Sequence, residues 1–173
     1  QQFVNATDSD TLLHSAYQGL EVLFDIKNTH ALFFLHDTSQ NIFIGKTATT
    51  ATDHNTVNEL TIPNQNGKTM VSMALKQARS INSFDHGAQY ELTIIDEQLI
   101  RVLGREGIVC FPMLAHGSPV GAGVIGVDKR SLAQVQADTK LLTMFFSQLA
   151  LALDAENIRQ TQAKNILAER LAA

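Results

Sequence analysis

Cysteine and histidine are the residue types with the widest capacity for chemistry, and this 173-residue chain contains one cysteine and six histidines. Cys110 stands in the apolar run 108–111, where a thiol is typically buried and inert. No two histidines are four residues apart, and only His116, in an expected tight turn, lies near the cysteine. Because zinc and haem need suitably placed ligands, we expect neither a metal nor a haem. The sequence also shows no Ser/His/Asp or Cys/His arrangement typical of nucleophilic catalysis.

A glycine pattern at 121–126 spells GxGxxG, the signature of a dinucleotide-binding turn. That turn requires a helix to open at the third glycine, so that the helix N-terminus meets the pyrophosphate. Here the glycines lie within an expected strand. We therefore predict no dinucleotide site.

Charge and composition exclude several classes of partner. The net charge is -4, which disfavours nucleic acid or an anionic membrane surface as the main partner. No run approaches the roughly 20 apolar residues of a membrane span, and the N-terminus shows no signal-peptide pattern. With one cysteine no internal disulfide forms, so we expect a cytoplasmic location. The chain ends inside an expected helix, which suggests a domain cut from a longer protein.

Hydrophobic periodicity and turn signals predict the elements that position these residues. The predicted order is helix 9–26, strand 30–36, turn 37–41, strand 42–47, loop 47–58, strand 59–62, helix 68–78, irregular segment 80–94, helix 95–104, strand 107–114, turn 115–119, strand 120–127 and helix 131–170. This order predicts an α+β fold, an antiparallel sheet with helices on its faces.

The last predicted helix has an unusual apolar pattern. Residues 141–153 are apolar nearly all round, which requires a second covering surface besides the sheet. After Asp154 the helix turns polar, and no good heptad pattern continues beyond Ile158. This stretch is either a cut-off tail or a dimer helix that leads to an output domain.

Five segments resemble the GAF domain family over residues 8–157, with 158–173 as the start of an exit helix. The similar segments are 31–37, 60–67, 79–85, the pair 109–113 with 120–127, and 148–153. The resemblance implies a GAF-like antiparallel sheet with terminal helices on one face and pocket-covering helices and loops on the other. It also implies a regulatory domain that encloses a small-molecule pocket and dimerises through its terminal helices.

Departures from the family pattern argue against two ligand classes. Cyclic-nucleotide members carry an Asn-Lys-Phe-Asp-Glu set, whereas this chain has Asp128-Lys129, Leu132 and Asp138 followed by Thr139. Bilin-binding members need a cysteine beside a histidine, which Cys110 lacks. The ligand is therefore unknown.

The resemblance and the strand alternation together predict the wall of the pocket. Side chains 32, 34 and 36 of the first strand should face the ligand, and 31, 33 and 35 the terminal helices. Helix 68–78 should offer free N–H groups to a neutral or anionic ligand. Asp85 is either a rim residue or a turn residue. The predicted ligand-binding residues are Leu32, Phe34, His36, Thr47, Lys68, Thr69, Asn82 and Asp85.

The predicted function is small-molecule sensing in a signal-transduction protein, most plausibly a histidine kinase, without catalysis by this domain. The expected partners are a second copy, a small molecule and a C-terminal output domain. One alternative is a structural dimerisation module with an empty pocket. The other is a free-standing GAF-type methionine sulfoxide reductase, which needs several reactive cysteines.

Overall fold

The computed structural model describes residues 8–46, 60–64, 68–85 and 91–172. Its helices are α1 (Asp8–Phe24), the short 3-10 helix η2 (Asn28–His30), α3 (Met70–Gln77), α4 (Ile94–Val102), α5 (Lys129–Ala137) and α6 (Thr139–Ala172). Its strands are β1 (Ala31–Asp37), β2 (Ile42–Lys46), β3 (Thr61–Pro63), β4 (Ile81–Asn82), β5 (Gly107–Ala115) and β6 (Ser118–Val127). The predicted α+β fold class is confirmed.

The six strands form one antiparallel sheet in the order β3-β2-β1-β6-β5-β4. The central pairs are the long β5·β6 hairpin and β1·β6, in which Leu32 lies opposite Val124. β3 is an edge strand, where a residue without an N–H such as Pro63 is tolerated. The prediction that the GxGxxG residues 121–126 lie within a strand is confirmed, because they belong to β6.

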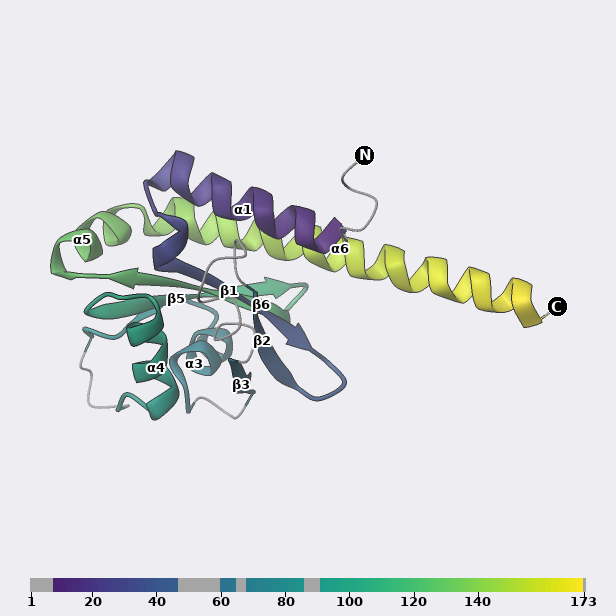
Figure 1. Ribbon diagram of the computed structural model, residues 1–173, viewed down its shortest axis with the longest axis horizontal. Coiled ribbons are helices and arrows are strands. Elements are labelled where there is room, and N and C mark those ends of the chain that lie inside the picture. Colours follow the sequence, from purple (N-terminus) through teal and green to yellow (C-terminus); the bar gives the residue numbers. More distant parts are fainter. Residues whose placement is uncertain (1–7, 47–59, 65–67, 86–90, 173) are drawn as a thin grey trace.

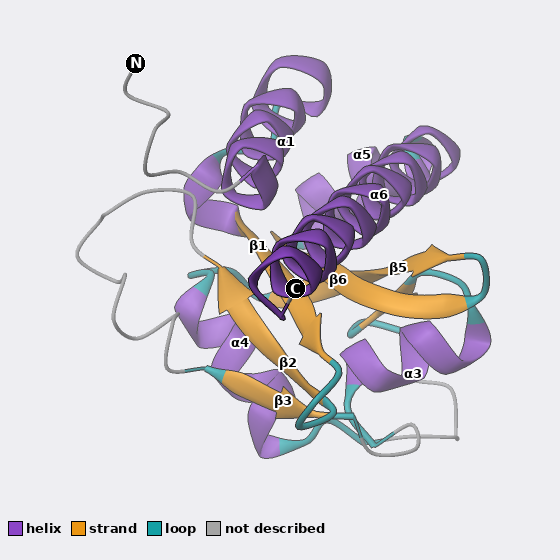
Figure 2. Cartoon of the chain, turned by 90° about the vertical axis from the view of Figure 1, so that its right-hand side faces the viewer, coloured by secondary structure: helices purple, strands orange, loops and turns teal. Residues whose placement is uncertain are grey.

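The sheet separates two hydrophobic cores, because successive side chains of a strand point to opposite faces. α1 and α6 cover one face, and α3 and α4 cover the other (Figures 1 and 2). On β1, Phe33 belongs to the core under α1 and α6, whereas Leu32 and Phe34 belong to the core under α3 and α4. The predicted alternation along this strand is therefore correct.

α6 lies along the sheet and then leaves the body of the molecule (Figure 1). Leu142, Phe146 and Leu153 are buried against the sheet, and Gly123 lets the ring of Phe146 approach β6 closely. Glu156 is the last buried residue of the helix. At 1.5 Å per residue the 16 residues after it, of the 34 in α6, extend about 24 Å.

The single predicted helix 131–170 is wrong at its N-terminal end. The chain forms α5, which starts two residues earlier at a capping box between Asp128 and Ser131, and α6 begins after Asp138. Asp138 ends α5, with φ -96° and ψ 8°. No glycine or proline marks this break. The predicted irregular segment 80–94 also contains the short strand β4, which local periodicity cannot reveal in two residues.

Within the described residues, no helix combines the length and apolar character needed to cross a membrane.

Candidate functional site

The floor of the predicted ligand site is a closed apolar layer on β1. Phe34 is 0% exposed and packs in one cluster with Leu32, Phe43, Met70 and Met73. In the part of this face that the structure describes, side chains fill the space between the sheet and α3.

His36 follows Phe34 on the same face of β1 and contacts the side chain of Asn41. Its Nε2 lies 2.9 Å from Oδ1 of Asn41, and the same oxygen accepts a hydrogen bond from Nδ2 of Asn64 at 3.1 Å. Because an amide oxygen only accepts, Nε2 of His36 must carry the proton. Nδ1 is buried with no hydrogen-bond partner in the described residues. The ring also lies 5.0 Å from that of Phe43.

The N-terminus of α3 is capped from within the protein. The Thr69 hydroxyl accepts from Ser72 N at 3.1 Å, and Oδ1 of Asp96 accepts from Met70 N at 3.0 Å. Asp96 is 0% exposed, and its Oδ2 also accepts from Thr93 N at 3.0 Å, within the capping box of α4. One buried carboxylate thus caps two helices.

Two of the N–H groups expected to be free at this helix end, those of Met70 and Ser72, are therefore capped within the protein, and the preference for a neutral or anionic ligand stays a prediction. The carboxylate that takes this place lies 26 residues further along the chain, so local sequence could not show it. Thr69 is 5% exposed and is engaged as the helix cap, while Lys68 is exposed at the surface.

Asn82 and Asp85 do not join Phe34. β4 is the edge strand opposite β3, and Asn82 pairs with Val109, whose side chain belongs to the core under α1 and α6. Asn82 Oδ1 accepts from Phe84 N at 2.9 Å, and Asp85 is exposed and donates its own N–H to Asn82 O at 3.3 Å. This geometry favours the turn role of Asp85. Thr47 lies outside the described residues.

Cys110 is buried, as predicted, and it lies on the α3/α4 side of the sheet. It is 0% exposed, and burial, followed by the charge of Asp96, raises the pKa of its thiol well above the ordinary value. A thiol with a raised pKa is a poor nucleophile. Among the described residues no three His, Cys, Asp or Glu side chains gather into a potential metal site.

A second feature is an apolar groove between α1 and α6, on the outer side of the terminal helices. Its volume is about 630 Å³. The large side chains along it are strongly exposed, 68% for Leu23, 59% for Leu141 and 57% for Met144. The groove is lined by Leu12, Ser15, Ala16, Leu23, Phe24, Leu141, Met144, Phe145, Gln148 and Leu149. The second covering surface predicted for residues 141–153 is thus not supplied by the described part of this chain.

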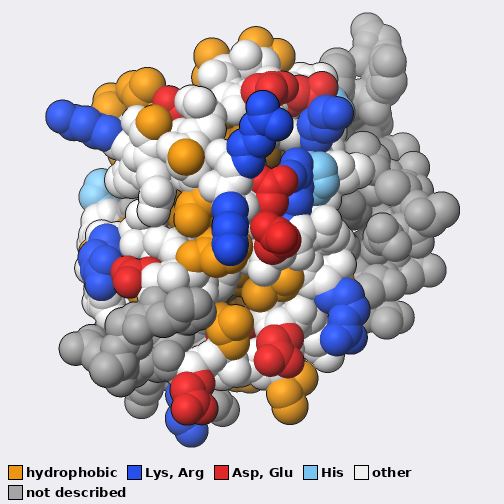
Figure 3. Space-filling view, turned by 90° about the vertical axis from the view of Figure 1, so that its left-hand side faces the viewer, with side chains coloured by type: hydrophobic (Ala, Val, Ile, Leu, Met, Phe, Trp, Pro, Cys, Tyr) orange, Lys and Arg blue, Asp and Glu red, His pale blue; other side chains and the backbone are white. Residues whose placement is uncertain are grey.

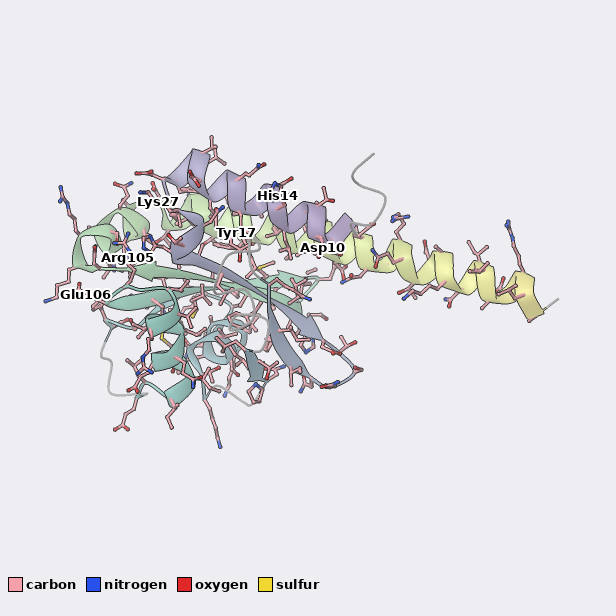
Figure 4. All side chains as sticks on the ribbon, viewed as in Figure 1. Asp10, His14, Tyr17, Lys27, Arg105 and Glu106 are labelled. Atoms are coloured by element: carbon pink, nitrogen blue, oxygen red, sulfur yellow. The ribbon has the colours of Figure 1, made fainter. Side chains whose placement is uncertain are left out.

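A charged cluster at the α5 end of the molecule was not predicted. Figure 3 shows basic and acidic side chains close together on this face, and Figure 4 places Arg105 and Glu106 there. Arg105 Nη1 lies 2.7 Å from Asp128 Oδ2, and its Nη2 lies 3.1 Å from His30 Nδ1. Burial, then Arg105 and Lys27, lowers the pKa of His30. The cluster joins three segments that are distant in sequence.

Several solved structures have a similar fold. The GAF domain/HD domain protein of Geobacter sulfurreducens superposes with a TM-score of 0.64 at 17% identity, over 88% of this chain and 95% of the other. The GAF domain of a two-component sensor histidine kinase from Bacillus halodurans gives 0.53 at 18%, over 83% and 96%. The chain has a GAF-like fold. The free methionine-R-sulfoxide reductase of Neisseria meningitidis is also similar, with a TM-score of 0.57 at 12% identity over 90% and 83%. No protein-family model matches the sequence, and no protein with a curated description matches it either.

The GAF-like fold agrees with the observed layers of helices and sheet. Terminal helices cover one face of the sheet, and α3 and α4 cover the other, as the resemblance implied. These neighbours include signalling proteins and an enzyme, so the fold by itself leaves the activity open.

Proposed function

We propose that this chain is the sensor domain of a cytoplasmic signalling protein and has no catalysis of its own. A small molecule binds at the His36 end of the α3/α4 face, beyond the closed apolar layer around Phe34, and its presence changes the arrangement of α1 and α6. This proposal rests on one observation: the two faces of a single sheet pack into two separate cores, and α6, which covers one of them, extends beyond the body of the protein. A histidine kinase after α6 is the output we favour, because a GAF domain of a sensor histidine kinase is among the structural neighbours.

His36 is the residue that we expect to recognise the ligand. Its Nδ1 has no hydrogen-bond partner among the described residues, and the ring lies on the same strand face as the buried apolar side chains of Leu32 and Phe34. A few oriented polar atoms beside apolar side chains are typical of small-molecule sites. The ligand should therefore carry a hydrogen-bonding group beside an apolar or aromatic part.

The terminal helices are expected to form a homodimer. The exposed side chains of Met144, Leu151 and Ile158 are seven residues apart on α6, with Leu141, Gln148 and Ala155 in the alternate positions. A seven-residue apolar repeat forms a coiled-coil seam with a second helix. This seam is continuous with the groove beside α1, so a second copy would cover both and carry α6 in parallel to the output domain.

Two alternatives make different predictions. A structural dimerisation module would dimerise and bind no ligand. A methionine sulfoxide reductase is suggested by one neighbour, but the sequence has a single cysteine, and it is buried. The purified protein should therefore not reduce free methionine sulfoxide in the presence of thiol reductants.

A thermal-shift screen with nucleotides, amino acids and aromatic acids tests the sensing proposal. A ligand at 100 times its Kd stabilises the protein by about 2.7 kcal/mol, which raises the Tm by roughly 5–10 °C for a chain of this size. The shift should fall sharply in His36→Ala and persist in His14→Ala, a matched change of an exposed histidine on α1. If no compound shifts the Tm, or if the shift is equal in both variants, the proposed site is wrong.

A further inference from the structure

A tyrosine side chain contacts two cross-strand partners of the β1·β2 pair. Tyr17 of α1 is 1% exposed, and Figure 4 shows it between α1 and the sheet. Its hydroxyl donates to Lys46 O at 2.6 Å and accepts from Phe33 N at 3.0 Å. Phe33 and Lys46 are cross-strand partners in the register. The hydroxyl therefore bridges the two groups that a continuous ladder would join directly.

The position of this bridge connects the two cores. Phe33 points to the α1/α6 side, where its ring lies 4.6 Å from that of Tyr17 in an edge-on arrangement. Its neighbours Leu32 and Phe34 point to the α3/α4 side. A displacement of β1 by events on that side thus changes the spacing that the Tyr17 hydroxyl must span.

We propose that the Tyr17 hydroxyl couples the spacing of β1 and β2 to the docking of α1 on the sheet. When the strands are apart, both hydrogen bonds hold α1 down; when they close, Phe33 N bonds directly to Lys46 O and the hydroxyl loses both partners. The buried hydroxyl cannot turn to water instead, so the two arrangements are distinct. The role of this coupling in signalling rests on the proposed function, whereas the coupling itself requires no ligand.

Tyr17→Phe removes the hydroxyl and keeps the ring. Amide hydrogen exchange followed by NMR should show α1 exchanging about tenfold faster relative to the amides of β5 and β6, the size expected for the loss of about two hydrogen bonds. The exchange of Phe33 should change as well. Leu20→Ala, a buried apolar change one turn along α1, should speed exchange in α1 and leave that of Phe33 unchanged relative to β5 and β6.

A double-mutant cycle tests whether a change in the α3/α4 core reaches α1 through Tyr17. Phe34→Leu alters β1 on its α3/α4 side and should speed exchange in α1 when Tyr17 is present, but not in the Tyr17→Phe background. An equal effect in both backgrounds would overturn the proposal, and so would a Tyr17→Phe effect that is uniform over the whole protein. Because no ligand is used, failure here leaves the ligand screen unaffected, and a negative screen leaves this coupling intact.

Discussion

The buried carboxylate of Asp96 allows a quantitative test of how the α3/α4 side is held together. Replacing it with alanine leaves Met70 N and Thr93 N without their acceptor. A hydrogen bond to a charged group contributes about 1.5–3 kcal/mol, so two contribute about 3–6 kcal/mol. Part of this loss is offset because a charge no longer has to be buried. We expect Asp96→Ala to lower the free energy of unfolding by about 3 kcal/mol.

Urea unfolding followed by circular dichroism measures this change. With an m-value of about 2 kcal/mol/M, the midpoint should fall by about 1.5 M. Asp96→Asn keeps one acceptor oxygen and should lose about half as much. Asp85→Ala removes an exposed carboxylate and should change the free energy by less than about 0.5 kcal/mol. All proteins must be compared at one concentration, because association stabilises the folded state. If Asp96→Ala unfolds at the same urea concentration as Asp85→Ala, the two-helix cap is not what stabilises this face.

Three further predictions concern other parts of the molecule. Gly123→Ala places a methyl group against the ring of Phe146 and should cost about 1–3 kcal/mol, seen as a lower Tm; an unchanged Tm would contradict the close packing of α6 on β6. Burial lowers the pKa of His30 below its ordinary 6.5, so the unfolded chain binds the proton more readily. The contribution of His30 to the free energy of unfolding is therefore complete above pH 6.5 and is lost as the pH falls below that value. His30→Asn should flatten the pH dependence of urea unfolding below about pH 6.5, and an unchanged slope would contradict a lowered pKa of His30 in the folded protein. Cys110 should resist a thiol reagent such as dithionitrobenzoate in the native protein and react fully in guanidinium chloride; rapid native reaction would show that it is accessible.

Hydrophobic patterns along the chain predicted most of the fold, because they indicate which face of each helix or strand is buried. The alternation 31–36 correctly assigned Phe33 and Phe34 to different cores, since β1 is a regular central strand with both faces covered. The all-round apolar stretch 141–153 correctly indicated a helix with two apolar surfaces. By contrast, the break at Asp138 depends on capping geometry alone, and a periodicity of 3.6 residues continues across it.

The site was less predictable, because long-range contacts decide which polar groups are free. Thr69 was predicted as a ligand contact, but its hydroxyl caps the first turn of α3, and Asp96 from α4 caps the same turn. Asn82 matched a rim position in sequence, but the register of β4 turns it to the other face. Tyr17 gave no signal in sequence, since a tyrosine on the inner face of an amphipathic helix reads as an ordinary core residue. His36 lies on the strand face predicted for it, together with Leu32 and Phe34, and its binding role stays a prediction.

The most direct test of the account is the mass of the protein in solution, because the proposed signalling through α6 depends on a second copy. Sedimentation equilibrium at micromolar concentration should give twice the chain mass of 18.9 kDa for the unaltered protein. Leu151→Glu places a charge in the exposed seam and should give the single-chain mass, whereas Thr143→Glu, exposed on the same helix outside the seam, should remain dimeric. A mass of 18.9 kDa for the unaltered protein, or dimers that Leu151→Glu leaves intact, would contradict the account.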